Sequence, residues 1–212
     1  MKFELISLTI VLKRKHMKKM TYILVGFVGI IVLFFVVMSF RYQNIESPDY
    51  VVLKSFDKNI ELRKYPQMIV AKTNLKDKSF DNSGSDGFRS IAGYIFGGNE
   101  KAEKIAMTSP VVMELSDSAT MYFVMPSKYK KSDLPNPSNK NVEIQEEASK
   151  VLLVVRYGGF SNDERIESHT EVLRQIIQKH HLNATGPFMY MGYNAPWDII
   201  NRRNEVAVEI IP

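Results

Sequence analysis

The sequence predicts an α+β fold in which antiparallel strands form a curved sheet or distorted open barrel, with two helices packed against it. The main observation is a repeat. After residue 50 the order strand pair, helix, strand pair occurs twice, over about 50–115 and about 120–212. The two copies share negligible sequence identity, so the repeat is one of pattern only. A second observation is an uncharged run before this domain, which predicts a transmembrane helix.

The uncharged run covers residues 21–40, TYILVGFVGIIVLFFVVMSF. Twenty residues at about 1.5 Å rise span about 30 Å, the thickness of a bilayer's hydrocarbon core. A buried core helix and a cleaved signal peptide are the alternatives. A signal peptide would have a shorter apolar region ending in a small-x-small site, whereas this run ends VVMSFRYQN. We therefore interpret it as an uncleaved anchor.

Charge around the run predicts its orientation. Five basic residues precede it between positions 13 and 19, and only Arg41 follows directly. The positive-inside rule then makes residues 1–20 a cytoplasmic segment, 41–49 a linker and 50–212 an extracytoplasmic domain of a single-pass membrane protein. The run MKKMTYIL reads as a complete basic start, so Met1 and Met17 both stay open as the native first residue.

Composition excludes several classes of site. Residues 1–41 hold seven of the 28 Lys/Arg and one of the 23 Asp/Glu, which leaves 21 basic against 22 acidic residues in the remainder. A near-neutral domain lacks the electrostatic footprint of a nucleic-acid partner. The absence of cysteine excludes disulfides, thiolate metal sites and cysteine nucleophiles.

Alternating apolar and polar residues predict strands over about 50–55 and 59–73, with Pro66 marking a bulge or an edge. The run DNSGSDG (81–87) reads as a loop of turn formers and helix caps. A helix is expected from Ser85 or Gly87 to Phe96, where GGN ends it. Its apolar stripe consists of Phe88, Ile91, Ala92 and Ile95.

Strands are predicted next over about 104–115 and 120–126, followed by a surface loop at 127–141 and strands over 142–149 and 150–160. Ser161 with Glu164 forms a capping-box pattern that opens a helix to about His181. The run GPFMYMGYNAP, a loop through WDIINRR and a last strand from 204 complete the chain.

Catalytic patterns are weak. The three histidines of the domain, His169, His180 and His181, all fall on one predicted helix, whereas a hydrolytic triad joins separate elements. Paired acids occur in contexts such as QEEASK, which are typical of solvated faces. We therefore expect no enzyme.

Three kinds of side chain could bind a ligand, each with a structural alternative. His180 falls within the helix's apolar stripe and could ligate haem iron, or it could balance the helix C-terminus. Methionines such as Met107 suit flat apolar ligands or fill a core. Arg202 or Arg203 could bind a carboxylate, or pair with Glu205 or a loop carbonyl.

Four segments together resemble the SOUL family of haem-binding proteins. They are KIAMTSPV (104–111) after FGGNE, IELRKYPQMIVAKT (60–73), YFVMPSKY with LPNPSNKNVEI (122–144), and YNAPW with RRNEVAVEI (193–210). They occur in the family's order across the domain. The resemblance implies a two-repeat distorted barrel with two flanking helices, and haem or a related porphyrin bound non-covalently in a hydrophobic cleft by one helix. It implies no known reaction.

One departure limits iron ligation. No histidine occurs between Met17 and Ser168, so the iron ligand is His180, a methionine, or absent. We expect the cleft to use Phe88, Ile91, Ala92 and Ile95 with Met107 nearby, and the ligand's propionates to meet Arg89, Lys104, Arg202 or Arg203. The segment 104–111 is then a shaped wall rather than a reactive site.

The predicted function is non-catalytic binding of a tetrapyrrole by an anchored extracytoplasmic domain. One rival is an envelope interaction or scaffold protein whose cleft binds no haem. Another is an enzyme that acts on a tetrapyrrole.

Overall fold

The computed structural model describes residues 17–34, 45–195, 198 and 201–211. The chain divides into two compact units, residues 1–44 and 45–212. In the first unit, residues 17–34 form a helix that is exposed along its length, with a mean hydropathy of 1.8. Its length and composition fit a membrane span or a signal sequence. Residues 35–40 of the predicted span lie outside the described residues, as do residues 1–16 and 41–44.

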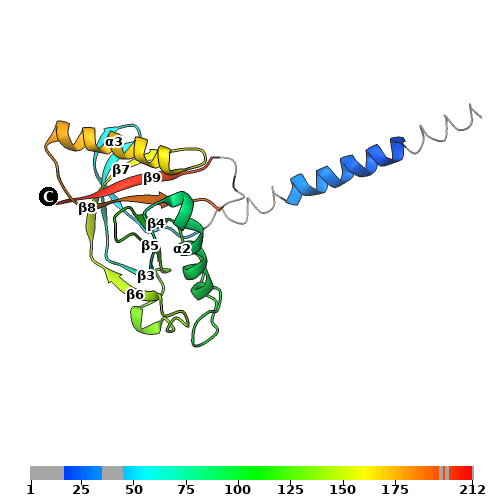
Figure 1. Cartoon of the computed structure of the whole chain (residues 1–212), viewed down its shortest axis with the longest axis horizontal. Helices are drawn as coiled ribbons and strands as arrows, with labels where there is room; N and C mark the ends of the chain where they lie inside the picture. Colours follow the sequence, from blue (N-terminus) through cyan, green and yellow to red (C-terminus); the bar gives the residue numbers. More distant parts are fainter. Residues whose placement is uncertain (1–16, 35–44, 196–197, 199–200, 212) are drawn as a thin grey trace, which may run out of the picture. The chain divides into compact units, whose positions relative to one another are not determined.

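The second unit is α+β, as predicted, with two helices against one sheet (Figure 1). Its elements are β1 (Val51–Asp57), β2 (Ile60–Tyr65), β3 (Met68–Asn74), α2 (Phe80–Ile95), β4 (Val111–Glu114), β5 (Thr120–Val124), a 3₁₀ turn (Lys131–Asp133), β6 (Val142–Glu147), β7 (Lys150–Tyr157), α3 (Asp163–His180), β8 (Asn183–Gly192) and β9 (Asn204–Ile211). All of the named strand pairs are antiparallel.

The nine strands form one open sheet in the order β1-β2-β7-β9-β8-β4-β5-β3-β6. Without β1, this order is symmetric. If β2, β3, β4 and β5 change places with β6, β7, β8 and β9 respectively, the new order is the original order read backwards. β5 therefore belongs with the first set of strands, whereas the sequence analysis assigned residues from 120 onward to the second copy. The sheet is open, with β1 and β6 at its edges, rather than closed as a barrel.

The single strand predicted over 59–73 is two strands in different parts of the sheet. β2 pairs with β7, and β3 pairs with β5 and β6. The break falls at Pro66 and Gln67, where proline offers no N–H to a ladder. Two strands that are adjacent in the sequence thus lie apart in the sheet, and each pairs with one strand of the second set, β7 for β2 and β6 for β3.

α2 begins at Phe80, not at Ser85 or Gly87 as predicted. The Ser79 side chain accepts a hydrogen bond from Asn82 N at 3.1 Å and caps the helix. The glycine-rich run is helical because the helix lies close to its neighbours there. A Cβ at Gly87 would stand 2.4 Å from Leu75 Cδ2. Close packing has overridden the poor helix propensity of glycine.

α3 is also capped differently from the prediction. Its N-cap is Asn162, whose Oδ1 accepts from Arg165 N at 2.9 Å. Ser161 instead shares a 2.7 Å hydrogen bond with the Tyr157 hydroxyl, so the predicted capping box does not form. Asp163 joins the two helices, because its carboxylate accepts from Ser79 Oγ at 2.6 Å and from Phe80 N at 2.7 Å.

Strand side chains alternate between two cores on the two faces of the sheet. In β7, for example, Leu153 joins the core that includes both helices, whereas Leu152 and Val154 join the other. The second core is made of strand residues, closed by Tyr50, Met68 and Tyr193. Within the described residues both cores consist of residues after position 45, so the second unit has a hydrophobic core of its own, as an independently folding domain requires.

Candidate functional site

The predicted ligand-binding face of α2 is packed into the core. Ile91 is 0% exposed, Ile95 1% and Ala92 6%. Phe88 is half-buried, with its ring centroid 5.3 Å from that of Phe123. The structure therefore brings these four residues together, but the protein's own side chains fill the space beside three of them.

Residues 104–110 pass along the C-terminal end of α2. Ile105 N donates to Ile95 O at 2.8 Å, and Asn99 holds the preceding loop through bonds to Tyr94 O and Glu103 O at 3.0 and 2.8 Å. Met107 is half-buried against the same core, and Lys104 is exposed. Met107 thus packs against the core to which α2 also contributes.

The segment 104–110 is not a strand, contrary to the prediction. Only a bridge between Thr108 and Glu46 forms before β4 begins at Val111. Pro110 has no N–H, and the polar groups just before it bind other segments. Thr108 Oγ1 donates to Val124 O, Ser109 N donates to Glu46 O at 2.8 Å, and the hydroxyls of Ser109 and Ser47 lie 2.7 Å apart.

These bonds fix an entry segment, residues 45–50, to the domain. Glu46 adds a further contact, because its Oε1 accepts from Ser127 N at 2.7 Å. Thr108 and Ser109 of the KIAMTSPV motif thus hold the chain that leads into β1.

The two arginines adopt the structural alternatives considered for them. Arg202 donates to the carbonyls of Ala195 at 3.0 Å and Asp198 at 2.5 Å, and its guanidinium carbon lies 4.6 Å from the Phe160 ring centroid. Its buried Nε has no hydrogen-bond partner in the part of the chain that the structure describes. Arg203 Nε and one terminal nitrogen donate to Glu205 Oε1 at 3.0 and 2.8 Å.

Glu205 is the centre of a buried ionic network, of which only the pair with Arg203 was expected from the sequence. It is 0% exposed and also accepts from Arg63 at 2.9 Å and from the Tyr193 hydroxyl at 2.8 Å. Burial lowers the pKa of Arg63, but the Glu205 charge and other partners outweigh it and raise that pKa. Burial, and then Glu205, raise the pKa of Tyr193. The signal in the sequence was Arg63, a charge that shares a strand face with Tyr65.

His180 is exposed at the C-terminal end of α3, with its ring 4.8 Å from that of Phe56. The other end of α3, at Asp163, is where α2 begins. Seventeen residues at about 1.5 Å rise separate the two ends by about 25 Å. The structure therefore does not bring His180 together with the candidate residues of α2.

The other histidines have structural contacts. His169 stacks on Tyr157 with ring centroids 3.8 Å apart, and His181 is the left-handed C-cap of α3. Within the described residues, no group of three or more His, Cys, Asp or Glu side chains could hold a metal ion.

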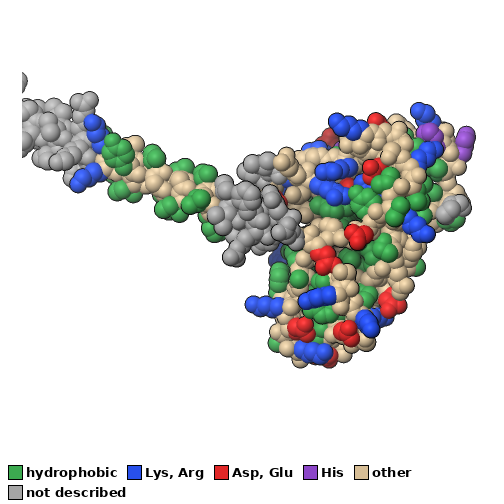
Figure 2. Space-filling model, turned by 180° about the vertical axis from the view of Figure 1, so that it is seen from behind, with side chains coloured by type: hydrophobic (Ala, Val, Ile, Leu, Met, Phe, Trp, Pro, Cys, Tyr) green, Lys and Arg blue, Asp and Glu red, His purple; other side chains and the backbone are tan. Residues whose placement is uncertain are grey.

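Surface charge of both signs is interspersed on the face shown in Figure 2, with apolar side chains between. Arg89 forms an ion pair at the surface, because it donates to Asp86 at 3.1 Å while its side chain stays 76% exposed. This distribution agrees with the near-neutral composition of the domain.

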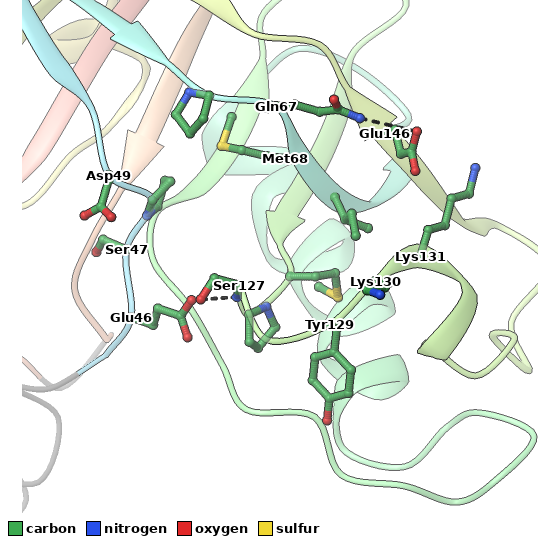
Figure 3. A pocket seen from close by; sticks show the side chains of 15 residues that line it. Glu46, Ser47, Asp49, Gln67, Met68, Ser127, Tyr129, Lys130, Lys131 and Glu146 are labelled. Carbon is green, nitrogen blue, oxygen red and sulfur yellow. Dashed lines mark hydrogen bonds between the residues drawn. The ribbon is translucent and has the colours of Figure 1, made fainter.

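A pocket of about 630 Å³ lies in the second unit (Figure 3). Four segments line it: residues 46–49, residues 66–69, residues 125–127 with 129–131, and Glu146 on β6. This volume is within the roughly 300–1,000 Å³ of small-molecule sites. The sequence analysis missed this pocket because its walls come from segments up to 100 residues apart in the chain.

Comparison with known proteins extends over the same unit. Residues 45–209 match the family described as SOUL heme-binding protein. The chain belongs to the SOUL family. The earlier resemblance is thereby confirmed at the level of family.

The curated relatives of this SOUL protein include heme-binding protein 1 of Xenopus laevis, 27% identical over 69% of this chain and 80% of the relative. Heme-binding protein 2 of Mus musculus is 27% identical over 77% of this chain and 85% of the relative. Heme-binding protein 2 of Homo sapiens is 28% identical over 69% and 75%.

Solved structures share the fold. The C-terminal domain of EcmrR superposes with a TM-score of 0.56 at 13% identity, over 72% of this chain and 96% of that domain. A hydrolase from Listeria innocua gives 0.52 at 8% identity, over 73% and 93%. At these identities the likeness concerns architecture alone.

Proposed function

We propose that the SOUL domain binds haem or a related tetrapyrrole non-covalently, without catalysing a reaction. The family match over residues 45–209 is the observation that carries this proposal, because it covers the folded domain almost completely. The relatives in frog, mouse and man are all named heme-binding proteins.

The α2 residues give one site for such a ligand. Since Ile91, Ala92 and Ile95 already fill the core, a ring at α2 would contact the half-buried Phe88 and Met107. Exposed cations could meet its carboxylates. Of the four candidates, Arg89 and Lys104 are exposed, whereas Arg202 is half-buried with its Nε enclosed and Arg203 is engaged by Glu205.

Titration of residues 42–212 with haemin tests the function. Burial of roughly 200–300 Å² of apolar surface at about 25 cal/mol/Å² contributes several kcal/mol before the entropy costs of association, which is consistent with micromolar binding. We expect a saturable Soret shift. Absence of saturation below about 100 μM would contradict the proposal. The variant H180A should leave the spectrum unchanged, since His180 lies far from α2.

The second candidate is an envelope interaction or scaffold protein that binds no haem. The filled face of α2 favours it, as does the edge strand β1, where Val51, Val52 and Leu53 are 64%, 44% and 51% exposed. A domain that fails the haemin titration yet crosslinks reproducibly to one envelope protein would establish this candidate instead.

We also propose that the N-terminal helix is an uncleaved single-pass anchor with its N-terminus in the cytoplasm. Its exposure along the described length and its mean hydropathy of 1.8 support a membrane environment. The basic residues before it support the orientation.

A further inference from the structure

The pocket of Figure 3 has walls of different chemistry. Its floor is apolar, with Met68 and Ile69 half-buried and Met125 only 4% exposed. Thioether side chains adapt to the faces of flat, irregular ligands. The floor can therefore receive the face of a ring.

Charges lie at opposite sides of the pocket (Figure 3). Glu46 and Asp49 of the entry segment stand on one side, and Lys130 and Lys131 stand on the other. Within the described residues neither lysine forms an ion pair, whereas Glu46 is held by Ser127 N at 2.7 Å. Glu146 is on the lysine side and accepts from Gln67 at 3.4 Å. An anionic ligand group would be repelled by the entry segment and attracted by the lysines.

The wall made by the entry segment is preformed. Ser109, which is 7% exposed, holds it through the bonds from its N to Glu46 O and between its hydroxyl and that of Ser47. Preformed walls reduce the ordering cost of binding. In contrast, a ligand beneath α2 would have to displace Ile91 and Ile95, which are 0% and 1% exposed.

We propose that this pocket, rather than the α2 face, is the tetrapyrrole site. The ring lies on Met68, Ile69 and Met125, and its carboxylates point to Lys130 and Lys131. This inference rests on the proposed function, because it names the site for the same ligand. It also gives the KIAMTSPV motif a role, since Thr108 and Ser109 hold one wall of the site in place.

The test compares charge reversals in residues 42–212 by haemin titration. The double variant K130E/K131E should raise the dissociation constant at least about tenfold, because it replaces two attractive charges with two repulsive ones. K128E is the matched control. Lys128 is exposed in the same loop, over the Tyr129 ring at 4.8 Å, but does not line the pocket. Its binding should stay within about twofold of the wild type.

A second ligand isolates the carboxylates. For protoporphyrin IX the double variant should show the same loss of affinity, and for its dimethyl ester the loss should disappear. An equal loss with both ligands would overturn the assignment of the carboxylates to the lysines.

The outcomes separate the site from the function. If K130E/K131E binds haemin as the wild type does while R89E/K104E binds weakly, the pocket assignment is wrong and the α2 site stands. If the wild type itself binds neither haemin nor protoporphyrin, the proposed function fails and the pocket assignment fails with it. All three variants change exposed side chains, so unchanged circular dichroism melts are expected.

Discussion

Glu205 is a fully buried carboxylate, and Arg63, Arg203 and Tyr193 all donate hydrogen bonds to it. A buried pair of this kind is expensive to break, because the remaining partner keeps its charge in a poorly solvated place. Arg63 also binds Glu61 at 2.7 Å, whereas Arg203 has a side chain that is 24% exposed. The network therefore links β2 to β9, which are not neighbours in the sheet, through the bond between Arg63 and Glu205.

The variant E205Q tests this dependence. It leaves the guanidinium of Arg63, only 3% exposed, without its full counter-charge, so the free energy of unfolding should fall by about 3 kcal/mol or more. Urea unfolding measures the change. The control is E209Q on the same strand, where no ion pair forms within the described residues and the loss should be under about 1 kcal/mol. Equal losses for the two variants would show that the network contributes nothing special.

Glu114 should make stability dependent on acid pH. Burial raises its pKa, but hydrogen bonds from Thr120 and Lys72 outweigh burial and hold that pKa below the ordinary 4.5. A carboxyl with a lowered pKa stabilises the fold fully above about pH 4.5, and the contribution is lost as pH falls through the folded-state pKa. The variant T120V removes one of these bonds. The difference in unfolding free energy between wild type and T120V should therefore shrink as the pH is lowered from 7 to 3. A constant difference would mean that the bond is not linked to ionisation.

At the scale of elements, local patterns located the helices and strands better than their ends. α3 occupies nearly its predicted span, because its apolar stripe and its polar face are both local features. α2 starts well before its predicted first residue. The glycines at 84 and 87 read as a loop in the sequence, yet they lie against Phe80, Leu75 and Met121. A glycine that permits close packing has no side chain, so it adds nothing to the periodic pattern from which a helix is predicted.

The Asp163 carboxylate couples the first turns of both helices. Replacement D163A removes the acceptor for Ser79 Oγ and Phe80 N, and should lower the free energy of unfolding by about 1–2 kcal/mol. Thermal and urea unfolding measure it. The control E164A removes a neighbouring first-turn charge that is exposed, so it changes the helix-dipole interaction alone, typically by under 1 kcal/mol. The proposed coupling would be wrong if both variants lost the same stability.

At the scale of the molecule, the chain consists of an apolar helix and a separately folded SOUL domain. The entry segment is the first described part of that domain, and it is bound to residues 108–109 and 127.

Fusions after residue 212 test the anchor and its orientation in a bacterial host. The positive-inside rule predicts that the C-terminal domain is exported. A fused alkaline phosphatase should therefore be active, and a fused green fluorescent protein should not fluoresce. Deletion of residues 1–40 is the control, and it should reverse both signals. An N-terminal epitope tag should remain on the mature protein. Loss of the tag would identify a cleaved signal peptide instead.

The sequence by itself determined the apolar helix, the α+β class and the SOUL resemblance, because composition, periodicity and motif order are properties of the chain read locally. The tertiary structure alone decided that β2 joins β7 rather than β3, that Ile91 and Ile95 are enclosed, and that Lys130 and Asp49 line one pocket. These features depend on which distant segments meet and on the volume left between their side chains. No local pattern encodes that volume, since it is set by packing between residues far apart in the chain.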